Sequence, residues 1–213
     1  IVELRHRERE VLRAEQLAAV GQLAAGVAHE LRNPLMSIKM LVQAGLDDGT
    51  GLHGEDLRVV VEEVRRLEAS LRTYLDFARP PKPARRPFDL ADLLETVAEL
   101  VRGRAERQRV QVRLDAPSTP VTADPEQLRQ VFVNLALNAI DAMPTGGVLS
   151  MCVRTGTRGV TVEVSDTGTG IAPEVSGKLF QPFASTKDTG LGLGLVISKR
   201  IIDDHQGALT AAN

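Results

Sequence analysis

Aromatic side chains are scarce in this 213-residue sequence, which contains no tryptophan, one tyrosine and five phenylalanines. Its hydrophobic core must therefore be mainly aliphatic, which suits helical seams and valine-rich strands. The single cysteine, Cys152, excludes an internal disulfide and favours a reducing compartment. No apolar run approaches the roughly 18 residues that a bilayer-spanning helix needs, and the sequence begins without the features of a signal peptide.

An excess of charge is also lacking, since 26 basic and 28 acidic residues give a net charge of −2. We therefore expect no nucleic-acid partner. We also expect this fragment to be cytoplasmic and to make no contact with a membrane. Ile1 to Gln16 is a charged helical pattern with no capping signal before it. This start predicts an upstream sensor, membrane span or second soluble domain, and a span would anchor the full-length protein in the inner membrane.

Two apolar stripes of helical period predict a pair of long helices. Turn residues fill Gly45 to Gly54 between them, so the pair forms a helical hairpin. Because one hairpin has too small a core to stand alone, we expect two copies to form a four-helix bundle, and hence a homodimer. The stripes consist of Val20, Ala24, Val27, Leu31, Ile38, Leu41 and Val42, and of Leu57, Val61, Val64, Leu67 or Glu68, Leu71, Leu75 and Ala78.

The first predicted helix carries the most chemically distinctive run, Ala28 to Leu35. At about 100° per residue, His29 points away from the apolar stripe, and Asn33 shares its face one turn later. Pro34 removes a backbone hydrogen bond and predicts a bend just after His29. Taken alone, the run fits an ordinary surface histidine on a coiled coil equally well.

Arg79 to Pro87 contains four prolines in nine residues and predicts a domain boundary. Beyond it the pattern alternates between helices and strands, which predicts an α/β sandwich with helices on one face of a mixed sheet. Asp124 and Pro125 are the expected cap and first residue of one of these helices. We expect helices over 90–107, 126–143 and about 196–201, and strands over 110–114, 148–154 and 160–165 with a short one from Val121.

Two glycine-rich motifs follow in this second part. Asp166 ends a predicted strand, where its carboxylate can accept a hydrogen bond from an exocyclic amine, while Gly168 and Gly170 let the backbone approach a flat ring. The segment 190–194, with Gly190, Gly192 and Gly194, opens the last helix and offers backbone amides to an anion. Each motif alone is also typical of a simple glycine-rich turn, and neither is a P-loop.

Asn134 and Asn138 lie four residues apart on one face of the predicted 126–143 helix. Carboxamide oxygens suit Mg²⁺, although paired asparagines can also cap neighbouring backbone. Ala172 to Thr189 is a long connection that we expect to act as a lid, and it includes Lys187.

In this order the motifs resemble those of bacterial two-component sensor histidine kinases. The sequences of 124–135 and of Ser185-Thr186-Lys187 are most similar to those of nitrogen-regulation-like members. The matching segments are His29 to Leu35 for the H box, Asn134 to Asp141 for the N box, Asp166 to Ile171 for the G1 box, Phe180 to Phe183 for the F box and Gly190 to Leu195 for the G2 box.

The resemblance implies that ATP binds in the second domain, with Asp166 on the adenine amine, Asn138 with Asn134 on Mg²⁺, and the glycines and lid on the phosphates. It implies that His29 takes the γ-phosphoryl group while Glu30 orients or deprotonates the ring. The phosphoryl group then passes to an aspartate of a response regulator receiver domain. Asn33 matches the position of a water-orienting side chain for dephosphorylation of that regulator.

Three departures from the family pattern stand out. Many relatives carry a basic residue in place of Asp141, so we assign phosphate neutralisation to Lys187. Leu191 replaces a small Thr or Ser in the G2 box. Relatives also continue through further strands after the position of Asn213, so the chain is either truncated there or lacks that tail.

We thus expect an N-terminal linker helix over 1–16, a dimerisation and phosphotransfer hairpin over 17–79, a proline-rich linker over 80–87 and an ATP-binding domain over 88–213. One rival is an ATP hydrolase of the gyrase, heat-shock-90 or mismatch-repair type, which resembles this fold but carries a glutamate where this chain has Asn134. The other is a non-catalytic dimeric scaffold, which the presence of His29, Glu30 and Asp166 disfavours. Whether His29 is phosphorylated within a subunit or across the dimer stays open.

Overall fold

The computed structural model describes residues 28, 31–47, 49, 51–78, 82–157, 159–182 and 192–213. The chain divides into two compact units, one through Pro80 and one that begins at Pro81. Within these described ranges, no helix is both long enough and apolar enough to cross a membrane.

The first unit contains the predicted helical hairpin. Residues 31–47 are helical, and the helix continues through Pro34, while α2 spans Gly54–Ala78. The turn between them uses Gly49 and Gly51 at φ of 65° and 73°, where a side chain would be strained. The bend predicted after His29 falls on residues 29–30, outside the described residues, and stays a prediction.

Each helix of the hairpin has a less exposed face and, apart from it, exposed apolar residues. One face carries the less exposed positions, which recur at intervals of three and four residues: Leu31, Pro34, Ile38 and Leu41, and in α2 Val60, Glu63, Leu67, Ser70 and Tyr74. Most of the stripe predicted in α2 is exposed instead, because Leu57, Val61, Val64, Leu71 and Leu75 are 41–54% exposed, whereas Leu67 is less exposed. The predicted stripe is therefore not the seam within one hairpin.

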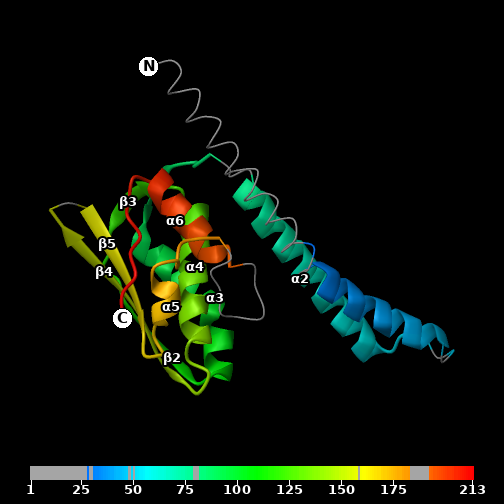
Figure 1. Ribbon diagram of the computed structural model, residues 1–213. Helices are drawn as coiled ribbons and strands as arrows, with labels where there is room; N and C mark the ends of the chain where they lie inside the picture. The colour runs from blue at the N-terminus through cyan, green and yellow to red at the C-terminus, as the bar shows by residue number, and fades with distance from the viewer. Residues whose placement is uncertain are drawn as a thin grey trace, which may run out of the picture. The chain divides into compact units, whose positions relative to one another are not determined.

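The second unit is an α/β sandwich, as predicted. Strands β2 (Val110–Asp115) and β4 (Gly147–Gly156) pair in parallel, and β5 (Gly159–Asp166) pairs antiparallel with β4. Helices α3 (Leu90–Arg107) and α4 (Pro125–Asp141) lie together against one face of this mixed sheet, and α6 (Gly194–Asp204) packs beside α4 (Figure 1). The short helix α5 (Pro173–Ser176), which was not predicted, lies in the expected lid.

The core between these layers is aliphatic, as the shortage of aromatic residues predicts. Its fully buried members come from every layer, so α3, α4, α6 and the sheet share one core. They include Leu94, Val97 and Val101 of α3, Val131 and Ile140 of α4, Leu149 and Met151 of β4, and Leu193 before α6.

A second, smaller sheet was not predicted. Strand β1 (Arg86–Asp89) pairs antiparallel with β3 (Pro120–Ala123). The predicted linker over 80–87 therefore overlaps a strand, since Pro87 is tolerated in a two-stranded pair. Asp89 then caps α3, and a hydrogen bond from Ser118, together with those from Thr119 and Ala91, lowers the pKa of its carboxyl group.

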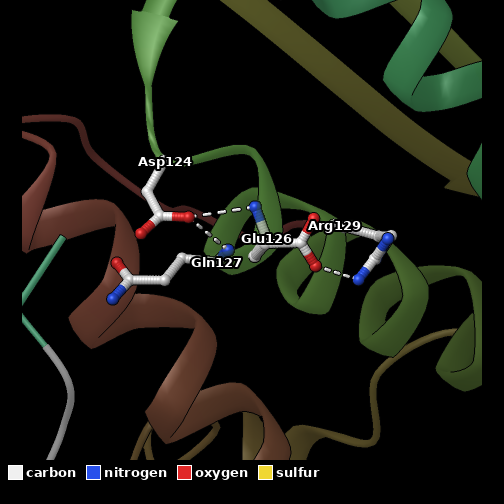
Figure 2. Close-up of polar contacts among 4 residues, drawn as sticks. All are labelled: Asp124, Glu126, Gln127 and Arg129. Carbon is white, nitrogen blue, oxygen red and sulfur yellow. Dashed lines mark hydrogen bonds and ion pairs between the residues drawn. The ribbon is translucent and has the colours of Figure 1, made fainter. Parts of the chain in front are cut away.

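Asp124 caps α4, as the sequence predicts. Its Oδ1 accepts the backbone N–H groups of Glu126 at 3.0 Å and Gln127 at 3.1 Å, as Figure 2 shows. Its Oδ2 accepts the N–H of Ala84 at 2.7 Å, so the same carboxylate ties the predicted linker to α4. The backbone N–H of Asp124 in turn donates to His205 Nε2 at the end of α6, at 3.0 Å.

Candidate functional site

Helix α4 carries the two predicted asparagines and contacts both glycine-rich segments of the predicted nucleotide site. The loop after β5 contacts the C-terminal end of α4, where the N–H of Thr169 donates to the carbonyl of Ala142 at 3.3 Å. A Cβ at Gly168 would stand 2.5 Å from that same carbonyl oxygen. Gly168 is therefore required for the close approach of the loop to the helix.

Asp166, the last residue of β5, is exposed at the start of this loop. Its Oδ1 accepts the N–H of Gly168 at 2.8 Å, which fixes the carboxylate. Within the described ranges, no hydrogen bond reaches the other oxygen. Asp166 therefore presents an oriented acceptor, which suits the exocyclic amine of a purine.

The far side of the same loop is held by Asn213. Its carboxamide accepts the N–H of Ile171 at 2.6 Å and donates to the carbonyl of Ile171 at 3.0 Å. Gly170 has φ of 72°, and a Cβ there would lie 2.9 Å from Asn213 Oδ1. No local pattern predicts this contact, because Asn213 is 42 residues from its partner.

The middle of α4 meets the start of α6. Asn134 Nδ2 donates to Ser198 Oγ at 2.9 Å, and a Cβ at Gly194 would overlap Asn134 Oδ1. Ser198 belongs to none of the predicted motifs, although its position four residues after Gly194 puts both on one face of α6. Gly192 has φ of 62°, a left-handed conformation that favours glycine.

Asn138 lies between these two contacts. It is half-buried on α4, one turn after Asn134 and one turn before the Ala142 carbonyl that the Asp166 loop contacts. Asn134 and Ala142 are about 12 Å apart along the helix axis. The asparagines, the Asp166 loop and the glycines before α6 therefore lie along one helix.

Asp141 forms an ion pair that was not predicted. Arg104 Nη2 of α3 lies 2.6 Å from Asp141 Oδ1. As noted for the sequence, many proteins with similar motifs have a basic residue at the position of Asp141. The side chain of Arg104 is 48% exposed, so the guanidinium is accessible at the end of α4.

Four predicted site residues, His29, Glu30, Lys187 and Gly190, lie outside the described residues, as does Phe183 of the F box. Asn33 is exposed in the first unit, on the helical segment 31–47. In the lid, Phe180 is half-buried, and Lys199 Nζ of α6 lies 5.8 Å from the centre of its ring.

The residues present fit ATP and Mg²⁺. Gly168 and Gly170 leave a narrow loop beside an oriented carboxylate, and the carboxamide oxygen of Asn138 is a hard donor of the kind that Mg²⁺ prefers. No group of three or more His, Cys, Asp or Glu side chains that could hold a metal ion occurs in the part of the chain described. A Mg²⁺ ion that arrives with substrate phosphates needs only one or two protein ligands.

Comparison with known proteins identifies both units. The His Kinase A (phospho-acceptor) domain matches residues 19–82, and the histidine kinase-, DNA gyrase B- and HSP90-like ATPase domain matches residues 123–213. The chain belongs to the two-component sensor histidine kinase family. The sensor histidine kinase ZraS of Escherichia coli K12 is 38% identical over 208 residues, which cover 96% of this chain and 45% of ZraS.

Solved structures of histidine kinases share the fold. The Acinetobacter baumannii histidine kinase AdeS is 28% identical with a TM-score of 0.70, over 87% of this chain and 91% of that one. The histidine kinase ThkA, crystallised in complex with the response regulator protein TrrA, is 29% identical with a TM-score of 0.71, over 97% of this chain and 61% of that one.

These matches confirm the recognition of the family and the fold class. The chain spans less than half the length of ZraS, the curated relative described above. The particular similarity to nitrogen-regulation-like kinases stays a prediction, as do the domain boundaries and the roles of individual site residues.

Proposed function

We propose that this chain autophosphorylates His29 with ATP and then passes the phosphoryl group to an aspartate of a response regulator. The convergence of the Asp166 loop, Asn138 and the glycines at the start of α6 along α4 carries this proposal. These groups lie in the order in which an extended nucleotide needs an adenine acceptor, a metal ligand and phosphate-binding amides.

In the transfer step, the unprotonated nitrogen of the His29 imidazole attacks the γ-phosphorus, and the bond to the β–γ bridging oxygen breaks to release ADP. Glu30 orients the ring and takes the proton of the other nitrogen. Asn138 would hold a Mg²⁺ ion, which would supply positive charge to neutralise the phosphates. A neutral imidazole is available near pH 7 because its unperturbed pKa is about 6.5.

The test is incubation with γ-labelled ATP and Mg²⁺. We expect an acid-labile, base-stable label on the intact chain and no label on His29→Ala. His53→Ala is the matched control, since His53 is an exposed histidine in the hairpin turn and should keep the label. Equal labelling of His29→Ala would refute the proposed acceptor.

The rival activity, ATP hydrolysis, is disfavoured at Asn134. A hydrolase of the related type needs a water-activating carboxylate there, whereas Asn134 has a carboxamide engaged with Ser198. ADP production should therefore depend on His29. Unchanged steady ADP production by His29→Ala would favour hydrolysis as the main reaction.

We also propose that two copies form a four-helix bundle. An open groove along segment 31–47 is lined by Leu35, Ile38 and Val42, and the exposed stripe of α2 adds a second apolar surface. A surface this apolar marks an interaction site, and a second copy covers both stripes at once.

Asn33 supports a further step, dephosphorylation of the regulator. It is exposed and lies one turn after His29, where its carboxamide can orient a water. Asn33→Ala should autophosphorylate normally while it slows loss of phosphate from the regulator. An equal loss of both activities would refute this role.

A further inference from the structure

We propose that Asn134 is a positioning residue that fixes the start of α6 and is not a ligand of the metal. This inference rests on the proposed ATP-binding function. The spacing of Asn134 and Asn138 alone would give both side chains the same role.

The first observation is the partner of Asn134. Its Nδ2 donates to Ser198 Oγ at 2.9 Å, and Ser198 is only 1% exposed. Ser198 lies on α6, where Ile197 and Ile201 are also buried. A buried hydroxyl needs a hydrogen-bonding partner, so this contact holds α4 and α6 at one distance.

The second observation is the space that Asn134 occupies. A Cβ at Gly194 would overlap Asn134 Oδ1 and would stand 3.0 Å from its Cγ and 3.1 Å from its Nδ2. The whole carboxamide therefore fills the position of a missing side chain on α6. Gly194 and Ser198 lie on one face of that helix, so together they form a notch that receives Asn134.

The third observation concerns how α6 begins. Its N-cap residue, Leu193, makes no side-chain capping hydrogen bond. Packing in the notch, instead of a cap, thus sets where the helix starts. Gly192, with φ of 62°, directly precedes this point and carries a backbone amide proposed to face phosphate.

The two asparagines consequently have different environments. To offer Oδ1 to a metal ion, Asn134 would have to leave the notch and give up its bond to Ser198. Asn138, one turn later, lies between the notch and the adenine loop. Asn134 acts on the nucleotide only through the position of α6.

The test adds a methyl group at position 194 and removes side-chain volume at position 134. Gly194→Ala should weaken ATP binding at least about tenfold, because its Cβ pushes α6 away from the carboxamide. The double variant Asn134→Ala with Gly194→Ala removes the obstacle, so it should bind ATP more tightly than Gly194→Ala alone. Gly103→Ala is the matched control, since a Cβ at this helical glycine meets nothing within 4 Å.

Magnesium dependence separates positioning from ligation. We expect Asn134→Ala and Ser198→Ala to weaken ATP binding without changing the Mg²⁺ concentration that half-saturates it, whereas Asn138→Ala should raise that concentration. A raised Mg²⁺ requirement in Asn134→Ala would overturn the proposal, and so would additive losses in the double variant.

A readout without nucleotide keeps this inference distinct from the proposed function. Thermal unfolding should show the same partial rescue of Gly194→Ala by Asn134→Ala, because the notch belongs to the packing of α4 on α6. If the unaltered chain bound no ATP, the proposed function would fail. Absence of rescue in thermal unfolding would refute the notch itself.

Discussion

In the second unit, the carboxylate of Asp124 accepts several backbone hydrogen bonds. Asp124 is buried, which by itself raises the pKa of a carboxyl group, but hydrogen bonds from Ala84, Gln127 and Glu126 and the nearby His205 outweigh burial. The pKa of Asp124 is therefore lowered in the folded state. Its ionised form stabilises the fold because three backbone N–H groups point at it.

We predict that Asp124→Ala lowers the free energy of unfolding by about 1 to 2 kcal/mol at neutral pH, through loss of the helix cap. Urea denaturation measures this change. Asp124→Ser, which keeps a capping oxygen, should lose less.

The pH dependence follows from the lowered pKa of Asp124. Its contribution is complete above the unfolded-state value, about 3.9, and is lost as the pH falls through the folded-state pKa. The difference in stability between the unaltered chain and Asp124→Ala should therefore shrink in acid. A constant difference down to the lowest pH at which the chain folds would contradict this explanation.

Asp166 allows a prediction about binding instead of stability. Asp166→Ala should abolish ATP binding measured by titration calorimetry, because it removes both the oriented acceptor and the hydrogen bond to Gly168. Glu163→Ala, at an exposed position on the same strand, should bind ATP normally. Retained ATP affinity in Asp166→Ala would count against the adenine site.

At the scale of elements, α3 reaches the site through one ion pair. Asp141 lies one turn after Asn138 on α4, so its negative charge opposes a polyphosphate, and Arg104 of α3 neutralises that charge. The pair is partly exposed, and such pairs contribute about 0 to 1 kcal/mol to stability. Its effect should therefore fall on nucleotide affinity.

We predict that Arg104→Gln weakens ATP binding with little change in the free energy of unfolding. Adding Asp141→Asn should restore affinity, because the negative charge that Arg104 had offset is then gone. Arg102→Gln, an exposed arginine on the same helix, is the control. Equal affinities for Arg104→Gln and the double variant would show that Asp141 does not oppose phosphate.

At the scale of the whole molecule, the exposed stripe of α2 predicts assembly. Leu71→Glu combined with Val64→Glu should convert the proposed dimer to monomers in light scattering, because each carboxylate would be buried against the second copy. Arg58→Glu, on the outer face of the same helix, should leave the dimer intact. A dimer that survives the double substitution would place the interface elsewhere.

The sequence alone determined the family motifs, the cap of α4 and most of the element boundaries. These features are local: Asp124 and Pro125 specify a helix start, alternating valines specify β5, and glycines mark sharp turns whatever surrounds them. The predicted helix over 90–107 coincides with α3 for this reason.

Only the tertiary structure decided which side chains meet. Asn134 and Ser198 are 64 residues apart, and Arg104 and Asp141 are 37 apart, so no local pattern links them. Likewise, the stripe of α2 shows that a face is apolar but not what covers it, and β1 pairs with a strand that follows α3 and β2. Local features depend on residues that are neighbours in the sequence, whereas contacts between distant residues depend on how whole elements pack.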